Sequence, residues 1–138
     1  MKKLVKLAAA ITMFSFAVTF LVSVVMTGQA TAGNFSKTCR NISLQGATLK
    51  VDCQKTPNRP GESSSYKAAS LNLDNGIGNN EGTLLWGGTN FSQSCKNLSL
   101  ERWTTLKADC GKKDLIYLPS SINLDERISN IDAVLKFD

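Results

Sequence analysis

The sequence predicts a mainly β fold in which two pseudo-symmetric tandem repeats form one compact domain. Residues 34–44 recur as residues 90–100, with seven of the eleven positions identical. Apolar and polar residues alternate with a period of two in residues 48–53 and again in residues 105–110, as is typical of half-buried strands. All four cysteines lie in these repeated segments. Two copies are too few for an extended solenoid, so we expect them to share one core.

Residues 1–32 precede the repeats and have the pattern of a secretory signal peptide. Three lysines come before a long apolar run, and residues 30–32 (Ala-Thr-Ala) supply a small-residue cleavage site. We therefore expect cleavage near Ala32 and a secreted or periplasmic protein. The alternative is a retained membrane anchor, because the apolar run of about twenty residues is just long enough to span a bilayer.

The remaining chain, residues 33–138, is expected to form a single domain. Repeat one occupies residues 34–86, a short Gly-Gly-Thr linker occupies residues 87–89, and repeat two occupies residues 90–138. Removal of the signal peptide lowers the formal net charge from +5 to +2, because it takes away three lysines and no acidic residue. No stripe of basic residues remains for a row of phosphates, so nucleic-acid binding is not expected.

The cysteines predict two disulfides. An even number of cysteines in an exported chain favours disulfide bonds, and four cysteines allow three pairings. Pairing Cys39 with Cys53 and Cys95 with Cys110 closes the same loop in each repeat, so we expect this arrangement. The spacings do not suit zinc, and the chain has no histidine. No metal or other cofactor is therefore expected.

The elements follow the same order in each copy. In repeat one, the strand at residues 48–53 is followed by an alternating segment at residues 70–74. Turn residues at 75–82 then precede a strand at residues 83–86, which predicts a hairpin. Asp74 and its counterpart Asp125 are at positions where single helical turns begin, and no segment is long enough for a regular helix. Repeat two has this order over residues 105–110, 121–125 and 133–137.

Two further features concern packing. A six-residue insertion in repeat one, rich in proline and glycine and centred on residues 56–61, indicates a surface turn. Aromatic residues recur at equivalent positions of the two copies, and we assign them to the core. They are Phe35 with Phe91, and Trp86 with Phe137.

Enzymatic activity is not expected. Without histidine, serine-protease, papain-like and most zinc-hydrolase sites cannot form in their usual arrangements. A glycosidase needs two carboxylates in different roles, whereas the acidic candidates here each have a counterpart in the other repeat. These candidates are Asp74, Glu81, Asp125 and Asp132.

Duplication favours a binding site that is made twice. Asn79 with Glu81 recurs as Asn130 with Asp132, and Thr38 recurs as Ser94. Hydroxyl, amide and carboxylate groups are suited to sugar hydroxyls, which both donate and accept hydrogen bonds. The alternative is that the two asparagines merely adopt a left-handed turn conformation.

The repeated patterns N-F-S-x-[TS]-C, L-K-x-D-C, S-[LI]-N-L-D and N-x-[DE]-[GA]-x-L resemble the cyanovirin-N homology family over residues 33–138. The resemblance implies a cyanovirin-N-like fold in which the copies exchange segments, so that each half combines the front of one copy with the end of the other. It also implies a lectin with oligomannose glycans as partners, as a monomer or a segment-swapped dimer. The founding member binds α1,2-linked mannose and thereby blocks enveloped viruses.

The same resemblance implies two sugar sites. Site one, the stronger, comprises Thr38, Gln54, Thr56, Asn130, Ile131 and Asp132, near Asn34, Lys37 and Lys55. Site two, the weaker, comprises Asn79, Glu81, Asn90, Gln93, Ser94 and Lys113, near Gly111 and Lys112. Site two ranks lower because Gly78 and Gly111 stand where the family lectin presents charged side chains. The alternative function is a secreted protein-interaction or surface-structural domain that has lost sugar binding.

Overall fold

The computed structural model describes residues 33–138, so the predicted signal peptide at residues 1–32 lies outside the described residues. The described chain is mainly β, as predicted: it contains ten short strands and four single turns of 3-10 helix. Within this part, every strand pair is antiparallel. No helix of residues 33–138 has the length and apolar character needed to cross a membrane.

Both repeats fold into the same series of elements, with η denoting a 3-10 turn. Repeat one contains η1 (Phe35–Lys37), β1 (Cys39–Gln45), β2 (Thr48–Lys55), β3 (Ser65–Asn72), η2 (Leu73–Asn75), β4 (Ile77–Asn80) and β5 (Thr83–Trp86). Repeat two contains η3 (Phe91–Gln93), β6 (Cys95–Glu101), β7 (Thr105–Gly111), β8 (Tyr117–Asn123), η4 (Leu124–Glu126), β9 (Ile128–Ile131) and β10 (Val134–Phe137). Each copy thus forms a three-stranded sheet followed by a two-stranded hairpin.

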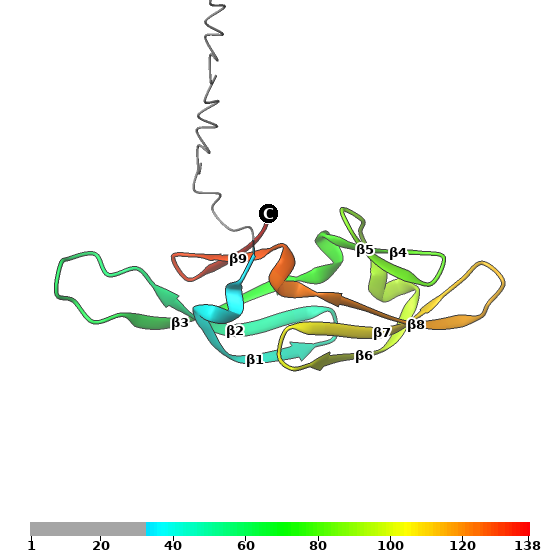
Figure 1. Cartoon of the computed structure of the whole chain (residues 1–138), viewed down its shortest axis with the longest axis horizontal. Coiled ribbons are helices and arrows are strands. Elements are labelled where there is room, and N and C mark those ends of the chain that lie inside the picture. Colours follow the sequence, from blue (N-terminus) through cyan, green and yellow to red (C-terminus); the bar gives the residue numbers. More distant parts are fainter. Residues whose placement is uncertain (1–32) are drawn as a thin grey trace, which may run out of the picture.

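The hairpins are exchanged between the copies. The β9–β10 hairpin packs against the β1–β2–β3 sheet, and the β4–β5 hairpin packs against β8. Figure 1 shows both hairpins on one side of the molecule, each above the sheet of the other repeat. The backbone N–H of Leu84 in β5, for example, donates to Oγ of Ser120 in β8 at 2.9 Å. The exchange implied by the family resemblance is therefore present.

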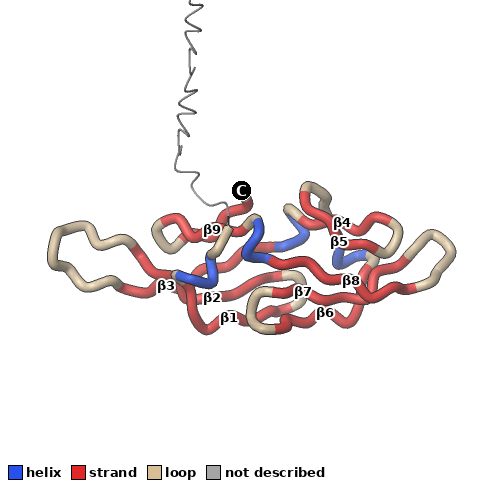
Figure 2. Tube along the Cα trace, viewed as in Figure 1, coloured by secondary structure: helices blue, strands red, loops and turns tan. Residues whose placement is uncertain are grey.

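Two aspartates hold the 3-10 turns that begin the sheets. The Asp125 carboxylate accepts the backbone N–H of Ser36 at 3.0 Å and also its hydroxyl. Asp74 does the same for Ser92, whose N–H lies 2.9 Å from Asp74 Oδ1. Figure 2 shows these helical turns between the sheets and the hairpins. The sequence predicts helical turns at Asp74 and Asp125 themselves, and these are present as η2 and η4. The turns η1 and η3, which the two aspartates bind, are not predicted from the sequence.

The core is centred on Phe35 and Phe91, which are fully buried as predicted. The assignment of Trp86 and Phe137 to the core needs correction, because both side chains are only partly buried and pack against the core from outside. Their rings meet edge to face, with centroids 6.3 Å apart. Each belongs to a two-stranded hairpin, to which no third strand is hydrogen-bonded. The Trp86 indole N–H instead donates to the Glu126 carboxylate at 3.1 Å.

The disulfides join Cys39 to Cys53 and Cys95 to Cys110, as the repeat predicts. The two members of each pair are direct register partners on neighbouring antiparallel strands, β1 with β2 and β6 with β7. Cys53 and Cys110 are fully buried. The sulfur bridges therefore form part of the core as well as crosslinks of the chain.

Two local predictions need correction. The alternating segment at residues 70–74 ends as a strand at Asn72, because its side chain caps η2 by accepting the N–H of Asp74. The turn of the β4–β5 hairpin is shorter than the predicted residues 75–82. Residues 77–80 form β4, and the chain reverses at Glu81 and Gly82.

Candidate functional site

Site one surrounds a small polar cavity at the junction of the two repeats. The cavity has a volume of about 280 Å³. One wall comes from the end of η1 and the end of β2, and the other comes from the β9–β10 hairpin. Its lining residues are Thr38, Gln54, Lys55, Thr56, Pro57, Asn130 and Asp132.

Asn130 connects the two walls. Its Nδ2 donates to Thr38 Oγ1 and to the backbone carbonyl oxygen of Gln54, both at 3.0 Å. Its Oδ1 accepts the backbone N–H of Ala133 at 2.9 Å and so closes the hairpin turn. Both amide protons are therefore committed within the protein, which makes Asn130 chiefly a positioning residue.

Asp132 lies at the tip of the hairpin and reaches the loop after β2. Its Oδ1 accepts the backbone N–H of Thr56 at 3.0 Å. The carboxylate has further acceptor capacity at the cavity, because each oxygen can accept two hydrogen bonds. The backbone of Asp132 is left-handed, with φ of 53°, a conformation that aspartate adopts more readily than most residues.

Site two has the same framework in the other half. Asn79 Nδ2 donates to Ser94 Oγ at 2.8 Å and to the carbonyl oxygen of Gly111 at 2.9 Å. Asn79 Oδ1 accepts the N–H of Gly82 at 2.9 Å. The duplicated polar residues predicted from the sequence thus occupy equivalent positions and make equivalent hydrogen bonds.

The two sites differ in the groups around this framework. Gly111 is the counterpart of Gln54, so site two has no side chain where site one presents an amide. Glu81 lies 3.9 Å from Nζ of Lys113, whose side chain is 92% exposed, whereas Asp132 is anchored by a backbone N–H. An ion pair this exposed contributes little to holding a loop in place.

Gly78 has a structural reason to be glycine. A Cβ at this position would lie 2.9 Å from the Cα of Gly88, because β4 passes directly over the linker between the repeats. Close backbone packing is therefore enough to explain why residue 78 is glycine.

The comparison with known sequences decides the family. The sequence model of the CVNH domain matches residues 35–136, which is most of the chain and almost all of its described part. The chain belongs to the CVNH family.

Solved CVNH structures have the same fold. The NMR structure of the CVNH protein of Gibberella zeae has a TM-score of 0.64 at 36% identity, covering 76% of this chain and 97% of that chain. Microvirin in complex with mannobiose has a TM-score of 0.64 at 31% identity, covering 77% of this chain and 99% of that chain. A MoCVNH3 variant in complex with (N-GlcNAc)4 shares the fold, with a TM-score of 0.68 at 21% identity over 78% of this chain and 98% of that chain.

Not every residue predicted for the CVNH sites lines the cavity. Ile131 is 52% exposed on the hairpin beside site one. Asn34 precedes η1 and donates its backbone N–H to the carbonyl oxygen of Asp125 at 2.7 Å. Lys37 belongs to η1, and Asn90 and Gln93 occupy the corresponding positions at η3. Pro57 was missed, because no repeated pattern marks the loop after β2.

The alternative explanation for Asn79 and Asn130 is wrong. Both lie in strands, β4 and β9, and neither has a positive φ. The left-handed positions in the hairpins are Glu81 at φ of 49° and Asp132 at φ of 53°. The asparagines recur because their side chains attach each hairpin to the other repeat.

Replacing Asn130 with alanine is expected to lower the free energy of unfolding by about 1–2 kcal/mol, because two hydrogen bonds between the repeats and one within the hairpin turn are lost, and the Gln54 carbonyl loses a partner. The matched variant Asn79→Ala should have an effect of similar size. Urea denaturation followed by circular dichroism measures both. Unchanged unfolding midpoints would show that the asparagines do not attach the hairpins.

Proposed function

We propose that the protein is a secreted, non-enzymatic lectin that binds mannose-rich glycans, with α1,2-linked mannose as its principal ligand. The observation that carries the proposal is the polar cavity of site one, whose framework is repeated at site two. Support comes from microvirin, a relative of this protein whose structure was solved in complex with mannobiose. Recognition of oligomannose on envelope glycoproteins would give such a lectin antiviral activity.

The chemistry of site one is suited to vicinal sugar hydroxyls. Thr38 contributes a hydroxyl, Gln54 an amide and Asp132 a carboxylate, and all three line the same cavity. A carboxylate accepts hydrogen bonds from two neighbouring hydroxyls, and such charge-assisted bonds are stronger than neutral ones. Neighbouring hydroxyls on the ring of a terminal mannose can donate such a pair of hydrogen bonds to the Asp132 carboxylate.

Two of the four candidate carboxylates are occupied by structural hydrogen bonds, and the other two lie apart. Asp74 and Asp125 each bind the backbone N–H and hydroxyl of a serine in the 3-10 turns. Glu81 and Asp132 lie in opposite halves of the molecule, each at its own hairpin turn. This arrangement supports binding rather than acid–base catalysis.

The rival function is a protein-interaction or surface-structural domain. The observation that favours it is Gly111, which leaves site two without the side chain that Gln54 supplies at site one. The missing side chain at Gly111 affects site two only, so we expect sugar binding to take place mainly at site one.

A glycan array separates these functions. The protein should bind high-mannose glycans and mannobiosides with α1,2 linkage more strongly than complex-type glycans, α1,3- or α1,6-mannobiosides, or N-acetylglucosamine oligomers. Absence of signal on every mannose-terminated glycan would refute the lectin proposal. Sedimentation of the same sample distinguishes a monomer from a segment-swapped dimer, in which the hairpins are exchanged between chains.

A further inference from the structure

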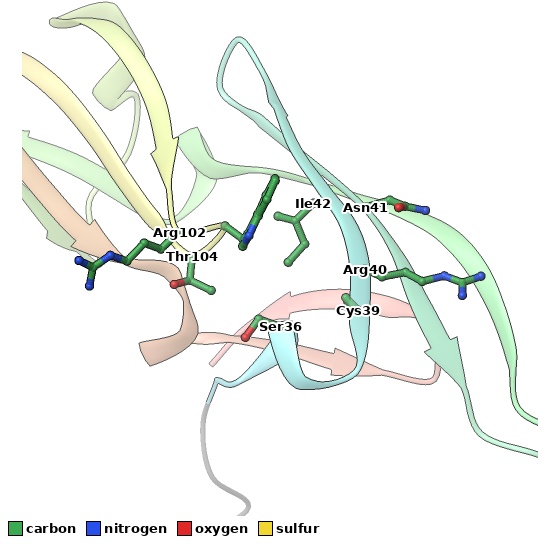
Figure 3. Close-up of a pocket in the computed structure, with 8 residues that line it drawn as sticks. Ser36, Cys39, Arg40, Asn41, Ile42, Arg102 and Thr104 are labelled. Carbon is green, nitrogen blue, oxygen red and sulfur yellow. The ribbon is translucent and has the colours of Figure 1, made fainter.

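A second cavity lies in the middle of the molecule, where η1 and β1 of repeat one meet the β6–β7 turn of repeat two. It has a volume of about 520 Å³ and shares no lining residue with site one. Figure 3 shows the guanidinium groups of Arg40 and Arg102 extending to opposite sides, with Ile42, Ser36 and Thr104 between them. The full lining is Ser36, Cys39, Arg40, Asn41, Ile42, Arg102, Trp103 and Thr104.

Trp103 is the unusual member of this set. Its side chain is 69% exposed, although tryptophan is highly buried on average. Trp103 and Arg102 also have left-handed backbones, with φ of 68° and 51°, which is strained for bulky residues. At the equivalent turn of repeat one, the chain has Gly46 and Ala47. A tight hairpin turn requires a positive φ, but glycine or asparagine adopts it with less strain than tryptophan, so repeat two has an exposed indole at a turn that does not need one.

The cavity combines an aromatic surface with hydroxyl and amide groups. Ser36 and Thr104 carry hydroxyls, and the Asn41 amide is fixed because its Nδ2 donates to Asp52 Oδ2 at 2.7 Å. The electron-rich face of an indole attracts the weakly positive C–H groups on one face of a pyranose ring. Hydroxyls around that ring then find partners in the polar groups of the wall.

The charge of the lining is positive. Its side chains include two arginines and no carboxylate, although Ser36 and Asn41 of the lining are hydrogen-bonded to the carboxylates of Asp125 and Asp52. Arg40 lies over the Tyr66 ring, with its guanidinium carbon 3.7 Å from the ring centroid, so its position is set by that contact. Arg102 lies on the exposed turn beside Trp103, and its fork of donors matches a carboxylate or a sulfate.

We propose that this cavity binds an acidic saccharide, with a pyranose ring stacked on Trp103 and its carboxylate or sulfate paired with Arg102. Arg40 adds to the positive potential at the opposite side. The ligand differs from the neutral mannosides of site one, and the proposal does not depend on them. The protein would thus bind two chemically different glycans at once.

The test uses three ligands with one scaffold: lactose, 3′-sialyllactose and 3′-sulfolactose. Binding is followed by calorimetry and by tryptophan fluorescence. Both acidic ligands should bind about tenfold or more tightly than lactose, because a charge-assisted bidentate pair is worth at least one order of magnitude. The tighter of the two shows whether the cavity prefers a carboxylate or a sulfate. Equal binding of lactose and the acidic ligands would overturn the proposal.

Variants locate the site. Trp103→Gly should abolish the binding of the acidic sugars while the protein stays folded, because glycine adopts a φ of 68° freely. Arg102→Ala should weaken it by about tenfold. Lys96→Ala is the matched control, since Lys96 lies over Tyr117 in repeat two as Arg40 lies over Tyr66, with its Nζ 3.9 Å from the ring centroid. It removes the same charge and should leave binding unchanged.

Three results would contradict the proposal. Retained binding in Trp103→Gly would place the ligand elsewhere. Equal losses in Arg102→Ala and Lys96→Ala would mean that only the net charge matters. Equally tight binding of a glutamate-containing tetrapeptide at Trp103 would show that the cavity recognises an acidic peptide rather than a sugar.

Loss of mannoside binding in Asp132→Ala, with acidic-sugar binding intact, would confirm that the two sites are separate.

Discussion

Replacing Cys39 and Cys53 together with alanine is expected to lower the free energy of unfolding by about 2–5 kcal/mol. The bridge closes a loop of sequence separation 14, so its loss increases the entropy of the unfolded chain. It also removes two sulfurs from the core, where Cys53 is fully buried. Because a small domain is stable by only about 5–15 kcal/mol, the effect is a large part of the total. Urea denaturation of the double variant measures it without a free thiol.

The second bridge provides the matched control. Cys95 and Cys110 enclose a sequence separation of 15 and occupy the same register positions in repeat two. Their double alanine variant should be destabilised to within about 1 kcal/mol of the first, since loop-closure entropy changes only slowly with length. A much larger loss for one pair would show that the two halves contribute unequally to the folded state.

Asp132→Ala is expected to weaken the binding of an α1,2-linked mannobioside by about 10- to 100-fold, because a charged hydrogen-bond acceptor is lost at site one. The same substitution also releases the loop at Thr56, whose backbone N–H is bound by Asp132. Glu81→Ala should weaken binding no more than about threefold, because its partner Lys113 is exposed and 3.9 Å away. Calorimetric titration of each variant measures both affinities.

Asp132→Asn separates charge from conformation. Asparagine keeps an acceptor for the Thr56 N–H and tolerates the left-handed backbone, but it removes the negative charge. We expect an affinity between those of the original protein and Asp132→Ala. If Glu81→Ala abolished binding and Asp132→Ala left it intact, the ranking of site one above site two would be reversed.

Most of the architecture could be predicted because the duplication is visible in the sequence. Repeated cysteines selected one disulfide pairing, and the period-two pattern identified β2 and β7 with Leu49, Val51 and Cys53 on the buried face. The 3-10 turns η1 and η3 could not be predicted from local pattern. They are held by Asp125 and Asp74, which lie far from them in sequence, so only tertiary structure reveals the contacts.

The site was only partly accessible to sequence reasoning. The recurrence of Asn79 and Asn130 marked them as special, but their role in attaching the hairpins depends on contacts with the other repeat. The cavity at Trp103 had no signal of its own, because this residue lies where the repeats differ. Agreement between the two copies marks only the features that both of them have, and Trp103 is present in one.

The exchange of hairpins determines the order in which the two sites can assemble during synthesis. The residues predicted for site two lie between Asn79 and Lys113, so they are all available once the strands up to Asn123 have emerged. Site one needs residues 38–57 together with Asn130 and Asp132 near the other end of the chain. The chain emerges during synthesis from its N-terminus, so the residues of site two are all present before the last residues of site one. Site one is therefore completed last, and proteolysis after Asn123 would remove it while leaving every residue of site two in the chain.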